Sequence, residues 1–191
     1  MIPASRLLPV VLTTQGGLAM AALLGAQVAG VRLAWGRPHY DVALGALVAA
    51  ALAAANLALL DRPGTWAAMR AAVDEVLLPT FAGLTRGQVV VVSLAAGIGE
   101  ELFFRGFLQP LAGVVAAAVA FGAAHVAGAR LVVFGVWAAA MGLVLGVLAL
   151  ATGGIVAPIT AHAGYDVLAF TYLRAEGRRR ASSKGSGSGE E

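Results

Sequence analysis

The sequence predicts an all-α protein: a polytopic bundle of about six transmembrane helices, with one amphipathic helix at the membrane surface. Of its 191 residues, 60% are hydrophobic and 12% are charged, whereas a soluble domain usually has about 25% charged residues. The apolar residues form runs of about 17–25 residues, which is the length that a helix needs to cross a bilayer. No alternating pattern typical of a β-barrel interrupts these runs.

Charge and cysteine content narrow the classes of function. The chain contains no cysteine, which excludes disulfides, thiolate metal sites and a cysteine nucleophile. The net charge of +3 comes largely from a cluster near the C-terminus, made of Arg174, Arg178, Arg179, Arg180 and Lys184. We interpret this cluster as a cytoplasmic flank attracted to the anionic inner leaflet, and we expect no nucleic-acid partner.

The N-terminal part, residues 7–86, contains two predicted spans. The first covers Leu7 to about Val31, which is longer than the apolar core of a signal peptide, so we expect a retained helix. The second runs from about Val42 to Leu60 and ends at the turn-forming sequence Asp-Arg-Pro-Gly at 61–64.

Residues 66–84 are ambiguous. Arg70, Asp74 and Glu75 interrupt the apolar pattern, and Pro79 is expected to break a helix. We therefore predict an amphipathic helix in the interface rather than a span. If this segment did span, the orientation of the N-terminal helices would reverse and that of the C-terminal half would not change.

The C-terminal part, residues 87–173, contains four predicted spans. The first begins near Gln88 and ends at Pro110, and the others cover residues 111–127, 131–150 and 155–173. The third contains two glycines at four-residue spacing, at positions 142 and 146, which permits close contact with a neighbouring helix.

Residues 1–180 are thus predicted to form one membrane-embedded domain. Residues 181–191 are rich in serine and glycine and are predicted to be disordered, and their Gly-Ser-Gly-Ser-Gly run is typical of an added linker. The distribution of lysine and arginine between the loops places both termini in the cytoplasm. The Ala/Gly/Arg-rich composition favours a bacterial inner membrane as the location.

The first C-terminal span contains three charged residues, Glu100, Glu101 and Arg105. A charge near the bilayer centre costs at least ~2.5–3.5 kcal/mol on insertion scales, so such residues indicate a functional site. Glu101 and Arg105 are four residues apart and share a helix face, which predicts an ion pair. Glu100 points about 100° away from Glu101 and remains available as a general base.

Two histidines occupy later spans. His125 follows Phe121 by one helical turn, and His162 precedes Asp166 by one turn. Two neutral histidines and Glu100 can activate a water molecule directly, by general base catalysis. The same three side chains can also hold a zinc ion that activates the water, and the residues alone leave both mechanisms open.

Other interpretations must be weighed against an active site. A single buried histidine usually has a packing role, and an ion pair can merely hold two helices together. The concentration of these groups on three spans favours a catalytic site. The alternatives are a non-catalytic membrane immunity or binding factor and, less favoured because the groups cluster instead of lining a path, a proton or ion pathway.

Three motifs resemble those of a known family: Glu100-Glu101-x-x-x-Arg105, Phe121-x-x-x-His125 and His162-x-x-x-Asp166. The family is the CPBP family of intramembrane endopeptidases, also called the CAAX-protease or Abi family. The resemblance covers about Val89 to Leu173. It implies a helical bundle with a catalytic cavity at the level of the membrane, and a protein or peptide substrate presented there.

The resemblance also implies a role for each residue. Glu100 and His125 would activate the attacking water, and His162 with the last motif residue would stabilise the oxyanion. Glu101 and Arg105 would support the site. Members of this family are usually treated as glutamic peptidases, so we favour a mechanism without a cofactor over a zinc mechanism.

Asp166 departs from the family pattern, in which this position is often asparagine. An ionised aspartate has no proton to donate to an oxyanion. Asp166 must therefore either be protonated or orient His162 through a carboxylate–histidine hydrogen bond, and we favour the second arrangement.

Overall fold

The structure is a computed structural model, and it describes residues 4–60, 66–126 and 128–186. These residues form helices and no named strand, which confirms the predicted all-α class; a single extended bridge joins Trp35 to Gly154. The helices are α1 (Ala4–Ala29), α2 (Pro38–Leu60), α3 (Trp66–Ala72), η1 (Val73–Leu77), α4 (Leu78–Phe81), α5 (Arg86–Glu101), η2 (Leu102–Leu108), α6 (Gln109–Ala124), η3 (Ala129–Leu131), α7 (Val132–Thr152) and α8 (Val156–Ser186).

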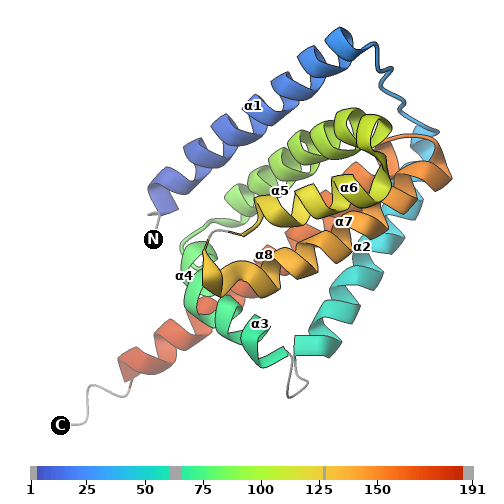
Figure 1. Cartoon of the computed structure of the whole chain (residues 1–191). Helices are drawn as coiled ribbons and strands as arrows, with labels where there is room; N and C mark the ends of the chain where they lie inside the picture. Colours follow the sequence, from blue (N-terminus) through green and yellow to red (C-terminus); the bar gives the residue numbers. More distant parts are fainter. Residues whose placement is uncertain (1–3, 61–65, 127, 187–191) are drawn as a thin grey trace.

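Helix α8 is the centre of the bundle. It packs along α2 and α5 and also contacts α7, while α6 and α7 pack against each other. Helix α1 lies on the outer side of α5 and of η2, which is π-helical (Figure 1). Leu7, Leu84 and Phe170 share one apolar cluster, so the start of α1 lies close to the middle of α8.

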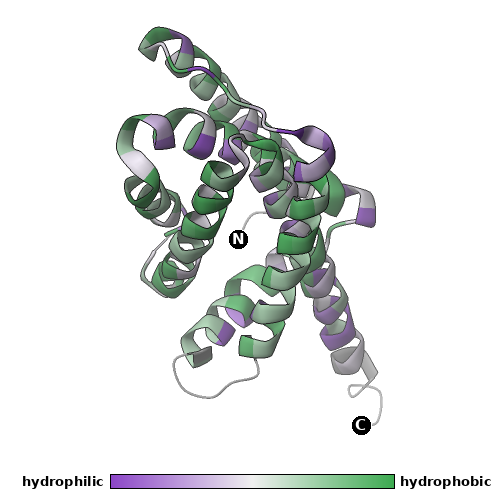
Figure 2. Cartoon of the chain, turned by 90° about the vertical axis from the view of Figure 1, so that its right-hand side faces the viewer, coloured by the Kyte–Doolittle hydropathy of each residue, from purple (hydrophilic) through white to green (hydrophobic). Residues whose placement is uncertain are grey.

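Four helical segments of the described chain are long and apolar enough to cross a membrane: Arg6–Ala29, Pro38–Leu59, Arg86–Ala124 and Val132–Thr152. Their large apolar side chains point outward, with Val28 90%, Leu47 69% and Val136 65% exposed. Figure 2, in which each residue is coloured by its hydropathy, shows that hydrophobic residues predominate along the helical ribbons. Such apolar exposure on several long helices is that of an integral membrane protein. Helix α8 is not among the four, since polar residues such as His162 lower its hydropathy.

The helix that carries the first motif does not end at Pro110, contrary to the prediction. The chain stays helical through η2 into α6, and the break comes at Gly113, where φ is +84° and ψ is 165°. Pro110 lies in the first turn of α6, directly after the π-helical turns of η2, where a missing N–H is tolerated. Gly113 takes the break instead because glycine adopts positive φ without a Cβ clash.

Residues 66–84 are helical as far as Phe81, in three short pieces. Pro79 does not interrupt them, because it follows the π-helical turn η1 and lies in the first turn of α4. The segment is not among the candidate spans of the described residues. Arg174 of α8 donates from Nε to the carbonyl of Leu84 at 2.6 Å and holds the end of the segment against the bundle. The predicted turn at 61–64 lies outside the described residues.

Helix α8 extends well beyond the predicted membrane span. It remains helical to Ser186, so residues 181–186 are not disordered as predicted, whereas 187–191 lie outside the described residues. Local side-chain contacts support this extension: Arg180 donates from Nε to Glu176 at 2.7 Å, and Ser182 donates to the carbonyl of Arg178 at 3.1 Å.

Candidate active site

Helix α5 begins with a capping box that sets the position of the first motif. The Thr85 side chain accepts a hydrogen bond from the backbone N–H of Gln88, whose side chain in turn accepts from the Thr85 N–H. Four turns later the helix places Glu100 and Glu101 at its end, and the π-helical η2 follows directly. Short π-helical segments of this kind occur frequently at functional sites.

Glu101 and Arg105 form the predicted ion pair. Arg105 Nη1 lies 2.8 Å from Glu101 Oε1, and both side chains are almost completely buried. The second guanidinium nitrogen, Nη2, donates to the carbonyl of Gly142 at 2.9 Å. The guanidinium carbon lies 4.5 Å from the centre of the Phe121 ring. Arg105 is therefore held by a carboxylate, a backbone carbonyl and an aromatic face.

The glycine pair on α7 explains how Arg105 reaches that carbonyl. A Cβ on Gly142 would meet Ala118 Cα at 3.2 Å, so the predicted close contact of α7 with a neighbouring helix is confirmed. Gln109 donates to the carbonyl of Gly146 at 3.0 Å, one turn along from the Arg105–Gly142 bond. Two side chains four residues apart thus bind two carbonyls four residues apart.

His125 is oriented by the first residue of its own motif. Its Nδ1 lies 2.7 Å from the carbonyl oxygen of Phe121. A carbonyl oxygen only accepts hydrogen bonds, so Nδ1 must carry the proton. In the neutral ring Nε2 then has a lone pair, and this atom lies 3.7 Å from Glu100 Oε2. The motif spacing therefore fixes the histidine tautomer as well as its position.

His162 is oriented by Glu101 and not, as expected, by Asp166. Its Nδ1 lies 2.8 Å from Glu101 Oε1, while Asp166 Oδ2 lies 3.6 Å from the other ring nitrogen, Nε2. Glu101 can reach Nδ1 because it approaches from α5, across the helix interface. Asp166 lies one turn further along α8 and meets the opposite edge of the ring. Nε2 of His162 is also 4.0 Å from Glu100 Oε2.

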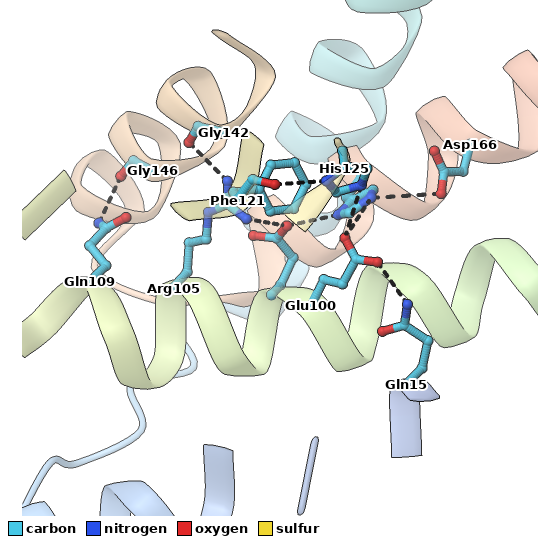
Figure 3. A network of polar contacts seen from close by, with 11 residues as sticks. Gln15, Glu100, Arg105, Gln109, Phe121, His125, Gly142, Gly146 and Asp166 are labelled. Atoms are coloured by element: carbon cyan, nitrogen blue, oxygen red, sulfur yellow. Dashed lines mark hydrogen bonds and ion pairs between the residues drawn. The ribbon is translucent and has the colours of Figure 1, made fainter. Parts of the chain in front are cut away.

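Glu100 lies beside His125 (Figure 3) and also close to His162. Its Oε2 faces both Nε2 atoms, and within the described residues this buried oxygen has no hydrogen-bond partner. Its Oε1 accepts a hydrogen bond from Gln15 Nε2 at 2.7 Å. The sequence interpretation missed Gln15, although a glutamine inside an apolar span is itself a signal for an interhelical hydrogen bond.

A cavity of about 310 Å³ adjoins these groups. Glu100, His125, His162 and Asp166 line it, whereas Glu101 and Arg105 lie behind its wall. The two consecutive glutamates therefore have the different surroundings that their 100° separation predicts. The rest of the wall is largely apolar and comes from α1, α2, α5, α7, α8 and the segment 66–84.

Three further polar side chains in the cavity wall escaped the sequence interpretation. Tyr165 OH accepts hydrogen bonds from Asn56 Nδ2 at 2.9 Å and from Trp137 Nε1 at 3.4 Å. These contacts join α2, α7 and α8 in the wall of the cavity that Glu100 and the two histidines also line. The three residues are far apart in the sequence and follow no motif, so their pairing could not be read from spacing.

In the described parts of the chain, no three His, Asp or Glu side chains are arranged to hold a metal ion. The Nδ1 atoms of His125 and His162 are engaged by Phe121 and Glu101. These contacts leave Nε2 of each ring as the nitrogen that faces Glu100 Oε2.

Comparison with known proteins agrees with the motifs. Residues 82–168 match the family model described as type II CAAX prenyl endopeptidase Rce1-like. No curated protein and no solved structure gives a significant match. The matched segment begins just after α4, ends within α8 and includes all three motifs. Residues 82–168 of this membrane protein therefore match the CPBP/CAAX protease family.

Proposed function

We propose that the protein is an intramembrane endopeptidase in which Glu100 and His125 activate a water molecule for attack on a peptide bond. The observation that carries this proposal is the convergence on Glu100 Oε2 of His125 Nε2 at 3.7 Å and His162 Nε2 at 4.0 Å, beside a cavity. The family match supports the class of reaction, a peptidase that works within the membrane.

The first step is the attack of water. A water molecule between Glu100 Oε2 and His125 Nε2 can donate a hydrogen bond to each, because both atoms have lone pairs directed at it. As the water oxygen attacks the carbonyl carbon, Glu100 takes one of its protons. A negative charge then develops on the former carbonyl oxygen.

The second step requires a donor to that oxyanion. His162 is suited to this role because Glu101 binds its Nδ1 and leaves Nε2 directed toward the cavity side. As an imidazolium held by the Glu101 carboxylate, it donates from Nε2 to the oxyanion. The proton on Glu100 then passes to the leaving amine as the C–N bond breaks, which yields a carboxylic acid and an amine and regenerates the site.

The family description indicates the first substrate to test, a prenylated protein or peptide with a C-terminal CAAX sequence. For this chain we propose a protein or peptide presented at the membrane. We further propose a bacterial inner membrane as the location, with the C-terminus in the cytoplasm, because the basic residues of α8 follow its apolar part.

The test is cleavage of a fluorescence-quenched, prenylated CAAX peptide by the purified protein in proteoliposomes, with an unprenylated peptide in parallel. His125→Ala and His162→Ala should each lower kcat/KM by about 10²–10⁴-fold, the usual contribution of a positioned acid or base. Normal cleavage by either variant, if it is folded, would exclude the mechanism. If the protein is instead a non-catalytic binding factor, neither the wild type nor its variants should cleave membrane-presented peptides, and the Glu100→Gln variant should still bind its partner.

Metal dependence is decided by a separate measurement. We propose that the peptidase works without a cofactor, so a chelator should leave the rate unchanged and elemental analysis should find no stoichiometric zinc. Loss of activity on chelation, with recovery on addition of zinc, would favour a zinc site made of Glu100, His125 and His162.

A further inference from the structure

Helix α1 lies outside the family match, yet it supplies a direct contact to Glu100. Gln15 Nε2 donates to Glu100 Oε1 at 2.7 Å. The face of α1 that packs against α5 and η2 is otherwise apolar, with contacting residues at three- or four-residue spacing: Leu7, Val11, Ala19 and Ala22. Gln15 is thus a polar side chain within an apolar helix seam.

Close approach of the two helices makes this contact possible. A Cβ on Gly99 would meet the Gln15 carbonyl oxygen at 2.6 Å and Gln15 Oε1 at 2.7 Å. The glycine therefore lets α1 lie directly against α5. Gln15 Oε1 packs against this glycine, so the amide nitrogen Nε2 is directed toward Glu100. This is the orientation that the contact requires, because a carboxylate accepts a hydrogen bond only from the N–H end of an amide.

The contact fixes the orientation of the Glu100 carboxylate relative to the histidines. A carboxylate side chain rotates about its terminal bond with little preference. With Oε1 bound by Gln15, Oε2 is the oxygen directed at His125 and His162. The Gln15 side chain also lines the cavity, next to the reacting groups.

We propose that Gln15 is a positioning residue for the peptidase reaction, which holds the Glu100 carboxylate so that Oε2 is presented to the attacking water. This inference rests on the proposed function of Glu100. It assigns to the N-terminal helix a part in catalysis in addition to its packing role.

The test compares Gln15→Met with Gln27→Met. Methionine keeps the unbranched shape of glutamine and removes the donor, and Gln27 is an exposed glutamine of the same helix. Gln15→Met should lower kcat by about 10- to 100-fold, the effect of losing a hydrogen bond to a charged group, with KM unchanged. Gln27→Met should have the wild-type kcat. A residue that merely joins two helices would lower the thermal unfolding midpoint of the protein and leave kcat unchanged.

If Gln15→Met folds poorly, Gly99→Ala is a second variant that perturbs the contact between Gln15 and Glu100. It should lower kcat in the same direction, and the double variant should lose little more than the stronger single variant, because both changes remove one interaction. A wild-type kcat in folded Gln15→Met, with Glu100→Gln inactive, would overturn the inference and leave the proposed function standing. Wild-type cleavage by Glu100→Gln would instead remove the proposed function, and the role of Gln15 with it.

Discussion

Glu101 is the residue on which the polar site depends. Its Oε1 lies 2.8 Å from both Arg105 Nη1 and His162 Nδ1, and its side chain is fully buried. One carboxylate oxygen therefore connects α5 to α8 and binds the Nδ1 edge of the His162 ring. Removing one partner of a buried ion pair leaves an uncompensated charge, which usually costs about 3–5 kcal/mol. Asp166 has a less direct part, since it lies 3.6 Å from the other nitrogen of His162.

This difference predicts that replacing Glu101 lowers kcat more than replacing Asp166. Glu101→Gln should lower kcat by about 10- to 100-fold, the usual effect of removing the carboxylate that orients a functional histidine. Asp166→Asn should lower it less, because the Glu101–His162 bond remains. Steady-state kinetics of the two variants, with thermal unfolding to check the fold, make the comparison. A larger loss in Asp166→Asn than in Glu101→Gln would show that Asp166 is the partner that His162 needs.

The helical segment formed by α5, η2 and α6 shows how the ends of a helix follow from local backbone chemistry. The π-helical η2 begins directly after Glu101, and the chain passes Pro110 without a break. The turn occurs at Gly113, whose φ of +84° with ψ of 165° is a conformation that L-residues with a Cβ rarely adopt. This turn lets α6 fold back so that Phe121 and His125 reach Arg105 and Glu100.

Gly113→Ala should therefore destabilise the protein through the backbone alone, since a Cβ at this position meets no atom within 4 Å. We expect the free energy of unfolding to fall by about 1–3 kcal/mol. Gly87→Ala is the matched control, because Gly87 also has open space but lies in regular α5. Unfolding by denaturant in detergent micelles measures both, and equal stability of the two variants would contradict the assigned strain.

At the scale of the whole molecule, the cavity unites the two halves of the chain. The C-terminal half carries the proposed acid–base groups, and the N-terminal half supplies much of the apolar wall. Met69, Val73, Leu77 and Phe81 line the cavity at four-residue spacing, so one face of the 66–84 segment is directed into it. This segment is held to α8 by the Arg174–Leu84 bond and by an ion pair of 3.1 Å between Arg180 and Asp74.

A larger side chain in this part of the cavity wall should impair the reaction without changing the proposed acid–base groups. Leu77→Trp should raise KM or lower kcat/KM for the prenylated peptide, because indole occupies part of a cavity of about 310 Å³. Ala71→Trp is the control, since Ala71 is exposed and belongs to the same segment. Equal kinetics of the two variants would mean that substrate does not occupy this part of the cavity.

The predictable parts of the site are those that depend on spacing within one helix. The Glu101–Arg105 pair and the separate exposure of Glu100 follow from 100° per residue. The partner of His162 and the contact of Gln15 with Glu100 depend on how distant helices pack, which spacing does not encode. The predicted end of the helix at Pro110 was wrong. Proline breaks a helix because it lacks an N–H and its ring clashes with the preceding turn, and the π-helical turns before Pro110 relieve this constraint.

The central claim is that the Glu100 carboxylate is the base that activates water. The most direct measurement is the single-turnover rate of peptide cleavage by wild type and by Glu100→Gln in the same proteoliposomes. Glutamine keeps the size of the side chain and its contact with Gln15 but cannot accept the proton, so the rate should fall by about 10²–10⁴-fold while peptide binding persists. Cleavage at the wild-type rate by folded Glu100→Gln would contradict the claim.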